Sequence, residues 1–410
     1  MTMKLKNNTI ITLLAVLLLV GCQNTPGDKQ FDPRQVNFTA EYNPMFDGQL
    51  YPSLILGINQ SKETAPLSTF SLSVTSPRDN AVLRIVLDSS ALNYVTIIQE
   101  ILPQRGEVYT FQPSIKWKYE VLRRLRQPGA VDLTFTCYIN DEEVDIKNLH
   151  VGYRTVNECP LSFVGGCKMN DFRWLFAAYV NEDHPQIEQI LTDILEQGNV
   201  KRISGYQSGE KEVKEQVFAV WYYALDRGIT YSSITCTSNP SPKANVQHIR
   251  FFDEVWQSRQ ANCVDACVFL ASIMRKMGLK PIIFVEPCHA YLGYYTDRNR
   301  KKVALLETTI TSWVNFPELE RSLDSTGRLP DADFAKVSKY LTEKDIDRYH
   351  SGNMTFEQLK KAVARSLFSK ASEYDRETYE NNLEHFNDSS AITYQQLDIE
   401  QLRKQVQPIN

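Results

Sequence analysis

A cysteine stands where the sequence predicts the start of a helix, and that position favours the reactive form of its thiol. Asn262 predicts a helix N-cap, with Asp265 as the N3 residue of a capping box. Cys263 would then be the first helical residue, and Gly278 would end the helix. The unpaired backbone N–H groups and the positive dipole end at that position favour thiolate over thiol. Cys263 is therefore a candidate nucleophile.

A histidine and a glutamate follow on segments that have the pattern of strands. Residues 289–295 and 302–307 are predicted to form adjacent antiparallel strands joined by a polar turn. A helix packed on this small sheet could bring the sulfur of Cys263 against one imidazole nitrogen of His289. Glu307 could then hold the other nitrogen. Nucleophile, base and orienting carboxylate are the three parts that thiol catalysis requires.

At these residues the chain resembles the transglutaminase-like superfamily of papain-type thiol enzymes. The resemblance covers roughly residues 165–320, and its specific core is 245–310. In that superfamily a cysteine at a helix start is followed by a histidine and then an acid on strands. A bacterial branch is resembled more closely, in four segments: Gln247-His248-Ile249-Arg250, Asn262-Cys263-Val264-Asp265, His289-Ala290-Tyr291 and Glu307-Thr308-Thr309.

The resemblance implies a mechanism and a role for each matching residue. A thiolate at Cys263 would attack a carboxamide or peptide and form a thioester, which water or an amine would then release. His289 would act as general base and then as general acid, and Glu307 would orient it. Gln247 would donate to the oxyanion beside the backbone N–H of Cys263. We therefore expect a papain-like cysteine hydrolase or acyltransferase with a peptide or protein substrate.

Two residues depart from the superfamily pattern. Glu307 stands where many members carry Asp, a tolerable change because Glu also accepts from imidazole. Cys288 stands where the related pattern has Gly, and its thiol could crowd the base or form a disulfide with Cys263. The alternative function is therefore a catalytically silent binding or scaffold lipoprotein that retains the fold.

Each candidate residue also has a structural alternative. Cys263 could be a buried structural cysteine, His289 a core histidine with satisfied hydrogen bonds, and Glu307 a solvated carboxylate at a strand end. A polar loop residue at position 247 needs no role. For three further residues the structural interpretation is the expected one: Asp265 as a capping acid, Arg250 as an ion-pair partner, and Cys267 as a cysteine with no second pair to make a zinc site. No metal or cofactor is expected.

The first residues have the build of a bacterial lipoprotein signal. Residues 9–20 are almost continuously apolar after two lysines, which is short for a membrane span of about 20 residues. The stretch ends in Leu19-Val20-Gly21-Cys22, which resembles the lipobox and implies lipidation of Cys22. The alternative is a plain signal peptide with an incidental cysteine. We expect a signal peptide over 1–21, a tether over 22–36, and anchoring in the cell envelope, with outer-membrane sorting implied by Gln23.

The elements around the site predict an α+β protein. Alternating apolar residues in 37–155, such as Phe70, Leu72 and Val74, predict an antiparallel β-sandwich of immunoglobulin-like size, with a helical turn within 116–126. The transglutaminase-like domain is predicted over 156–325 and a helical C-terminal region over 326–410. Helices are predicted over 171–180, 185–197 and 213–228, and over 369–387 as a charged, solvated helix face.

Charge and cysteine content restrict the partners. The 410 residues include 45 basic and 49 acidic side chains, so no basic surface for nucleic acid is indicated. After Cys22 there are seven cysteines, so at least one is unpaired within the chain. Cys159 and Cys167 flank a Pro/Gly-rich stretch and could close a small loop, which the sequence alone does not establish.

Overall fold

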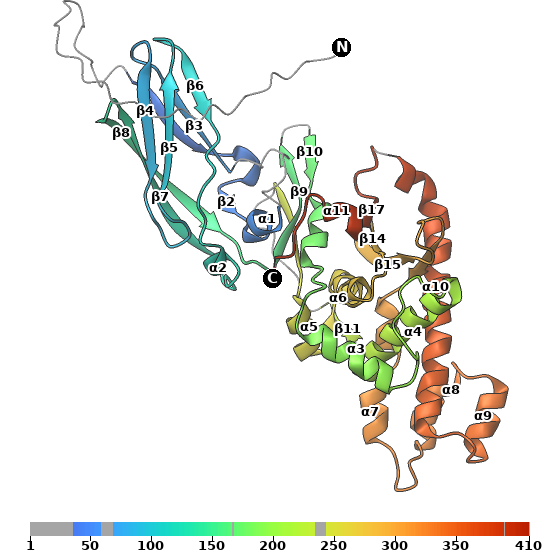
Figure 1. Cartoon of the computed structure of the whole chain (residues 1–410). Coiled ribbons are helices and arrows are strands. Elements are labelled where there is room, and N and C mark those ends of the chain that lie inside the picture. Colours follow the sequence, from blue (N-terminus) through green and yellow to red (C-terminus); the bar gives the residue numbers. More distant parts are fainter. Residues whose placement is uncertain (1–35, 59–68, 166–167, 234–242, 389, 410) are drawn as a thin grey trace, which may run out of the picture.

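The computed structural model describes residues 36–58, 69–165, 168–233, 243–388 and 390–409 (Figure 1). It is a mixed α+β protein with antiparallel sheets and a helical C-terminal region, as predicted. The predicted signal peptide and the predicted lipidation site Cys22 lie outside the described residues, as does Cys167. Cys159 has a free, buried thiol. Among the described residues, no helix has the length and apolar character that crossing a membrane requires.

The N-terminal part is built from two sheets. One has the order β1-β3-β6, with β1 Phe38–Tyr42, β3 Phe70–Thr75 and β6 Val108–Phe111. The other has the order β2-β8-β7-β4-β5, with β2 Gln49–Leu50, β8 Glu142–Tyr153, β7 Gly129–Ile139, β4 Ala81–Leu87 and β5 Thr96–Leu102. All pairs are antiparallel except β2 with β8. Two short helices, α1 Pro52–Gly57 and α2 Tyr119–Leu122, accompany them, the second inside the predicted helical interruption.

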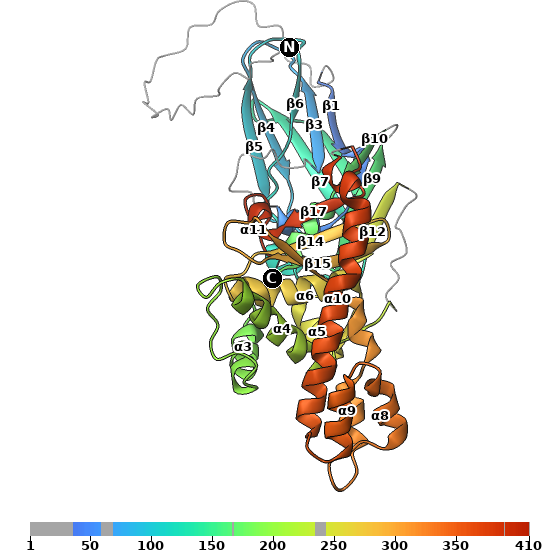
Figure 2. The ribbon, with the colours of Figure 1, turned by 90° about the vertical axis from the view of Figure 1, so that its right-hand side faces the viewer.

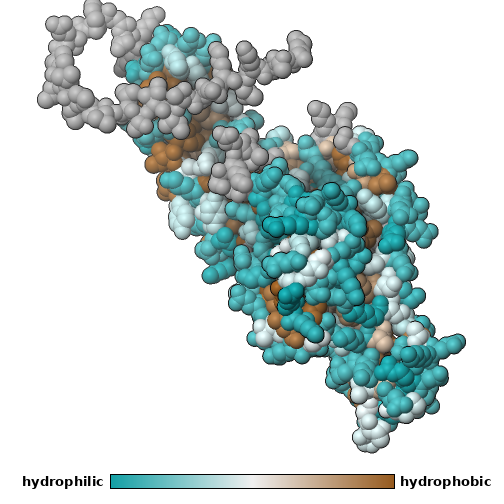
Figure 3. All heavy atoms as spheres, turned by 45° about the vertical axis from the view of Figure 1, so that its right-hand side comes forward, coloured by the Kyte–Doolittle hydropathy of each residue, from teal (hydrophilic) through white to brown (hydrophobic). Residues whose placement is uncertain are grey.

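The sheets face each other through the residues that alternate in the sequence. Phe70, Leu72 and Val74 of β3 are buried, as their period of two predicts. The ring of Phe70 lies 5.8 Å from that of Phe135 on β7, so the two inner faces meet. The outer face is less polar than usual, because Val82 and its cross-strand partner Ile101 are half exposed or more. Figure 3 shows hydrophobic residues on the surface of the N-terminal part.

The two parts of the chain pack closely against each other. Phe46 from the N-terminal part makes an edge-to-face contact of 5.2 Å with Phe163 on β9 (Glu158–Gly165). Near the C-terminus, the N–H of Gln407 donates to the carbonyl of Gly57 at the end of α1 (2.8 Å). The apolar core is continuous through both parts. The last residues of the chain therefore fasten the N-terminal part to the site-bearing part.

A four-stranded antiparallel sheet organises the site-bearing part. Its order is β16-β15-β14-β17, with β16 Val303–Leu306, β15 His289–Tyr295, β14 Pro281–Glu286 and β17 Gln395–Asp398. The helix α6 (Cys263–Lys276) lies on one face, which buries Ile283 and Leu292 in the main core. The long helix α10 (Phe356–Asn387) crosses the other face (Figure 2).

Smaller elements surround this sheet. The strands β9, β10 (Lys168–Asp171) and β12 (Ala244–His248) form one sheet, and β11 (Thr230–Tyr231) pairs in parallel with β13 (Gln260–Ala261). The helices α3 (Gln186–Glu196) and α4 (Glu210–Asp226) confirm the predictions over 185–197 and 213–228. The remaining helices are α5 (Phe252–Ser258), α7 (Phe316–Arg321), α8 (Asp331–Ser338), α9 (Glu343–His350) and α11 (Ile399–Leu402).

Two predictions about helices need correction. The helix predicted over 171–180 is a strand end followed by the 3-10 helix η3 (Arg173–Tyr179), in which five consecutive residues are buried and no amphipathic face exists. The segment 369–387 is not only a solvated face, because Tyr379 and Phe386 pack edge-on against Phe284 of β14 (5.3 and 5.6 Å between ring centroids). The aromatic residues on this face of the sheet are buried by α10, which removes their apolar surface from water. The C-terminal region also supplies the unpredicted strand β17.

Gly293 on β15 allows an aromatic ring to lie across the sheet. A Cβ at this position would meet Cε2 of Phe284 at 2.4 Å. We expect Gly293→Ala to destabilise the protein by about 2 kcal/mol through overpacking. Urea unfolding measures this, and Phe284→Leu in the same chain should restore part of the loss because it vacates the space. A single variant as stable as the wild type would contradict this packing.

Candidate active site

A capping box fixes the start of α6 and so the position of Cys263. The side chain of Asn262 accepts from the N–H of Asp265, and the Asp265 carboxylate accepts from the N–H of Asn262, both at 2.9 Å. Asp265 is fully buried and also accepts from the backbone N–H and the guanidinium of Arg250 at 2.8 Å. Asp265 as a capping acid and Arg250 as its ion-pair partner are therefore confirmed, and Cys263 is the first residue of the helix.

Thr308 ties the end of β16 to the first turn of α6. Its hydroxyl lies 3.5 Å from the carbonyl of Cys263 and 4.0 Å from the sulfur of Cys267. Cys267 and Thr308 are both fully buried, whereas Cys263 is only partly buried. Cys267 therefore points into the core, and the residue before Thr308, which is Glu307, is held close to the helix start.

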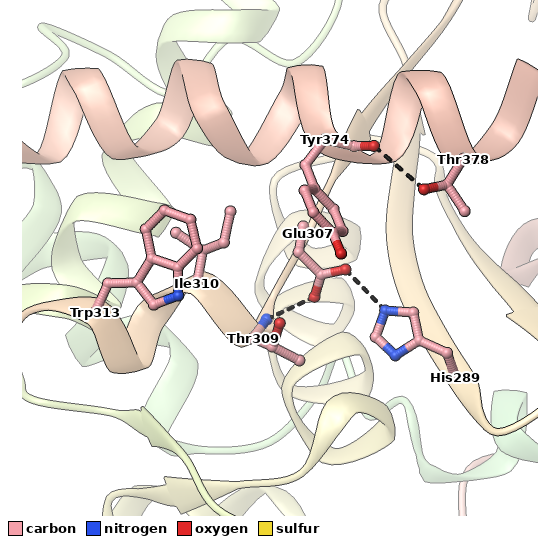
Figure 4. Close-up of a pocket in the computed structure, with 7 residues that line it drawn as sticks. All are labelled: His289, Glu307, Thr309, Ile310, Trp313, Tyr374 and Thr378. Carbon is pink, nitrogen blue, oxygen red and sulfur yellow. Dashed lines mark hydrogen bonds and ion pairs between the residues drawn. The ribbon is translucent and has the colours of Figure 1, made fainter.

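Glu307 is buried and forms a hydrogen bond with the imidazole of His289. Its Oε2 lies 2.7 Å from Nε2 of His289, and its Oε1 accepts from the N–H of Thr309 at 2.8 Å (Figure 4). Its backbone N–H donates to the carbonyl of Ala371 on α10 (3.1 Å). Because Glu307 is only 1% exposed, the alternative of a solvated carboxylate at a strand end is wrong.

His289 is hydrogen-bonded to Glu307, and interactions with Cys263 and Glu307 both favour its charged form. The hydrogen bond with Cys263, and then that with Glu307, raise the pKa of His289 to about 10, against the opposing effect of burial. Burial pushes the pKa of Glu307 upward, but the hydrogen bond and charge of His289 outweigh it and hold that pKa below its ordinary value. Since Nε2 is taken by Glu307, Nδ1 is the nitrogen left for the sulfur. The structure thus brings the three predicted residues into one chain of contacts.

Gln247 lies near the start of α6, and its side-chain amide already donates a hydrogen bond within the protein. Its Nε2 donates to the carbonyl of His248 at 2.9 Å, and the amide of Asn262 donates to the same carbonyl at 3.3 Å. The side chain therefore neighbours the N-cap of α6, one residue from Cys263. In this conformation it serves a backbone carbonyl, which fits the alternative of a polar residue without a catalytic role.

Tyr231 is a residue of the site that sequence reasoning missed. It lies on β11, whose partner β13 leads directly into α6. Burial first, and then the nearby charges of Cys263 and Glu307, raise the pKa of its phenol. A strand of two residues has no periodicity to detect. Only the proximity of Tyr231 to the sulfur, which the fold creates, marks it as a residue that could contact substrate.

Cys288 occupies a turn position that suits glycine. Glu286 pairs with His289, so Pro287 and Cys288 form a two-residue connection between β14 and β15. Cys288 has φ of 66°, and a turn with Pro first and a positive φ second is of type II, which favours Gly. Glycine would therefore adopt this turn with less strain than Cys288 does. Cys288 is exposed, and both it and Cys263 are free thiols, so no disulfide joins them here.

A cavity of about 370 Å³ opens beside the imidazole (Figure 4). Its lining comes from the site itself, from the 3-10 helix η4 (Thr309–Trp313) and from α10. The lining residues are His289, Glu307, Thr309, Ile310, Trp313, Tyr374 and Thr378. Among the described residues, no three His, Cys, Asp or Glu side chains gather as a metal site would require.

No protein-family model matches this chain, and no curated protein matches it either. The interpretation of the site accordingly depends on its own geometry and on the residues that predicted it.

The strain at Cys288 generates a prediction. We expect Cys288→Gly to stabilise the protein by about 1 kcal/mol, because glycine adopts positive φ without the Cβ penalty. Cys288→Ala keeps that penalty while removing the thiol, so it should leave the free energy of unfolding near the wild-type value. Urea unfolding of both variants is the measurement. Equal stability of the Gly and Ala variants would contradict a strained turn.

Proposed function

We propose that this protein is a papain-like cysteine hydrolase or acyltransferase of transglutaminase-like type, acting on peptide or carboxamide bonds through a thioester. The observation that carries the proposal is the chain of contacts Cys263–His289–Glu307, with the sulfur at a helix start and the carboxylate buried. An imidazolium between a sulfur and a carboxylate favours the thiolate, which is the nucleophilic form.

The reaction follows from the positions of the three side chains. The thiolate of Cys263 attacks the carbonyl carbon, and the oxyanion forms near the N-terminus of α6, where the helix dipole is positive. The imidazolium of His289 gives its proton to the nitrogen as the C–N bond breaks, and the amine leaves. The thioester then passes to water or to an amine, and His289 removes the proton of that nucleophile. Glu307 holds the ring and balances its charge throughout.

The N-terminal part and the N-terminal signal complete the proposal. Two facing antiparallel sheets support an immunoglobulin-like spacer or binding module. The sequence Leu19-Val20-Gly21-Cys22 supports a lipid anchor in the cell envelope, and Gln23 after it supports the outer membrane as the destination. The alternative is a catalytically silent scaffold of the same fold, and the thiol of Cys288 next to the base is the feature that favours it.

Differential alkylation tests the activated thiol. We expect iodoacetamide to label Cys263 faster than the exposed Cys288 below neutral pH, because the imidazolium of His289 favours thiolate at Cys263 alone. The advantage should shrink as pH rises through the His289 pKa of about 10, where the ring loses its proton. Peptide mass spectrometry assigns the label.

His289→Asn is the matched variant for this measurement, because it removes the cation and keeps a polar side chain of similar reach. The rate at Cys263 in this variant should fall to that of Cys288. Equal labelling rates at the two cysteines in the wild-type protein would contradict the enzyme proposal and favour the alternative, a catalytically silent scaffold.

Lipid attachment has its own test. In a bacterial host, labelled palmitate should enter the wild-type protein and not Cys22→Ser, because only the thiol accepts the diacylglyceryl group. Incorporation into both proteins would show that Cys22 is an incidental cysteine.

A further inference from the structure

We propose that two copies of this chain associate through strand β5, which pairs antiparallel with β5 of the second copy about a two-fold axis at Gln99. The pairing would join the two five-stranded sheets into one continuous sheet. This inference concerns the N-terminal part and goes beyond the chemistry proposed for Cys263, on which it does not depend.

The strand β5 is an edge strand without the features that usually protect one. It ends the order β2-β8-β7-β4-β5, and among the described residues no strand pairs with its outer side (Figure 1). Its pairing with β4 is regular over all seven residues, Thr96–Leu102. Natural edge strands are often short, bulged, or carry lysine or proline, because their free N–H and C=O groups otherwise pair with another chain. The only charged residue within β5 is Glu100.

Apolar side chains are exposed on the outer face of the sheet along this edge. Ile97 is 54% exposed and Ile101 is 64% exposed, and both lie on the same face as Gln99 between them. On β4, Val82 lies opposite Ile101 and is 50% exposed, and Val86 lies opposite Ile97. A contiguous apolar patch on a protein surface is typical of an interaction site. Here the patch continues to the unpaired edge of the sheet.

Neighbouring segments limit the free edge to the central residues of β5. The N–H of Tyr94 donates to the carbonyl of Lys116 (2.8 Å), and the N–H of Lys116 donates to the hydroxyl of Thr96 (3.0 Å). The backbone at the start of the strand is therefore occupied. At the other end the strand is followed by Pro103, which has no N–H to donate. The edge that can accept another strand is thus residues 97–102.

This free length matches itself in one register. A two-fold axis perpendicular to the sheet keeps the same face outward in both copies. With the axis at Gln99, Ile97 lies opposite Ile101 of the second copy, and Glu100 lies opposite Ile98. An axis at Ile98 would extend the pairing into the occupied start of the strand. An axis at Glu100 would place two carboxylates opposite each other, and like charges in that position destabilise a sheet.

The same register covers the exposed apolar side chains of both copies. On the outer face, the pair Val86–Ile97 of one copy continues into the pair Ile101–Val82 of the other, and the two-fold axis repeats this row. Between the rows the two Gln99 side chains face each other, and each amide carries both a donor and an acceptor. Any extended peptide offers backbone groups to this edge. The second copy is favoured because its isoleucines repeat at the spacing that the edge requires.

Cysteine cross-linking in bacterial cells that express the full chain tests the register. Oxidation should join Gln99→Cys chains into a disulfide dimer, because directly opposite residues have Cα atoms about 4.5–5.5 Å apart, within disulfide reach. Ile97→Cys and Ile101→Cys should each stay monomeric when expressed alone, since each is displaced from its own copy by about 14 Å along the strand. Co-expression of these two chains with different tags should give the mixed dimer. Nonreducing gels measure the yields.

The background for these chains is Cys263→Ser with Cys288→Ser. Among the described residues this removes the two cysteines whose thiols are not fully buried. The same background without an added cysteine is the blank, and its dimer yield is subtracted. Because both thiols are absent throughout, no outcome of the cross-linking depends on the chemistry proposed for the site.

Matched substitutions assign the association to the apolar edge. Ile101→Lys in the Gln99→Cys chain should reduce the dimer yield about tenfold or more, because it places a charge in each apolar row. Val108→Lys is the control, because Val108 is 62% exposed and lies on β6, an edge strand of the other sheet. It should leave the yield unchanged. Both side chains are exposed, and urea unfolding checks that both variants remain folded.

The cross-linking pattern decides between association in this register and its alternatives. A dimer of Gln99→Cys that Ile101→Lys abolishes and Val108→Lys leaves intact would support the proposal. The absence of that dimer would overturn it. Equal dimer yields from Gln99→Cys, Ile97→Cys and Ile101→Cys expressed singly would also overturn it, because random collision ignores the register. A cross-link from Gln99→Cys to a host protein in place of the dimer would show that another chain occupies the edge, which likewise contradicts the self-association.

Discussion

Glu307 carries a carboxylate that is almost fully removed from water, and a buried charge of this kind is costly unless it is paired and hydrogen-bonded. The imidazolium of His289 is its partner at 2.7 Å, and the N–H of Thr309 takes the second oxygen. This pairing favours the charged ring, and the proposed function depends on that charge next to the sulfur of Cys263. Removing His289 leaves the buried carboxylate of Glu307 without its cation.

The C-terminal region completes the site from a distance in the sequence. The helix α10 accepts the backbone N–H of Glu307, covers the aromatic face of the sheet and contributes Tyr374 and Thr378 to the cavity. The strand β17 then adds the edge next to β14, and Gln407 fastens the chain end to α1. The C-terminal region therefore contributes to the site, to the four-stranded sheet and to the attachment of the N-terminal part. A substitution in α10 is expected to affect the site and the sheet that it covers.

Local sequence patterns predicted those parts of the site whose conformation depends on residues close in the sequence. The capping box of Asn262 and Asp265 placed Cys263 at a helix start, and alternating apolar residues placed His289 on a strand. Cys288 has a positive φ, a conformation that glycine adopts without strain. Other features depend on contacts between distant segments. Tyr231 reaches the site from a strand of two residues, and the packing of Tyr379 under Phe284 joins segments that no local periodicity connects.

The central claim is that His289 stays protonated because it interacts with the sulfur of Cys263 and with a buried carboxylate. The most direct test is an NMR titration of the ring nitrogens of His289 in the full chain. The account predicts that both nitrogens remain protonated well above the pH at which a free imidazole becomes neutral, and that the ring titrates near a pKa of about 10. A ring that loses its proton at the ordinary histidine pKa would contradict the charged pair, and with it the activated thiol at Cys263.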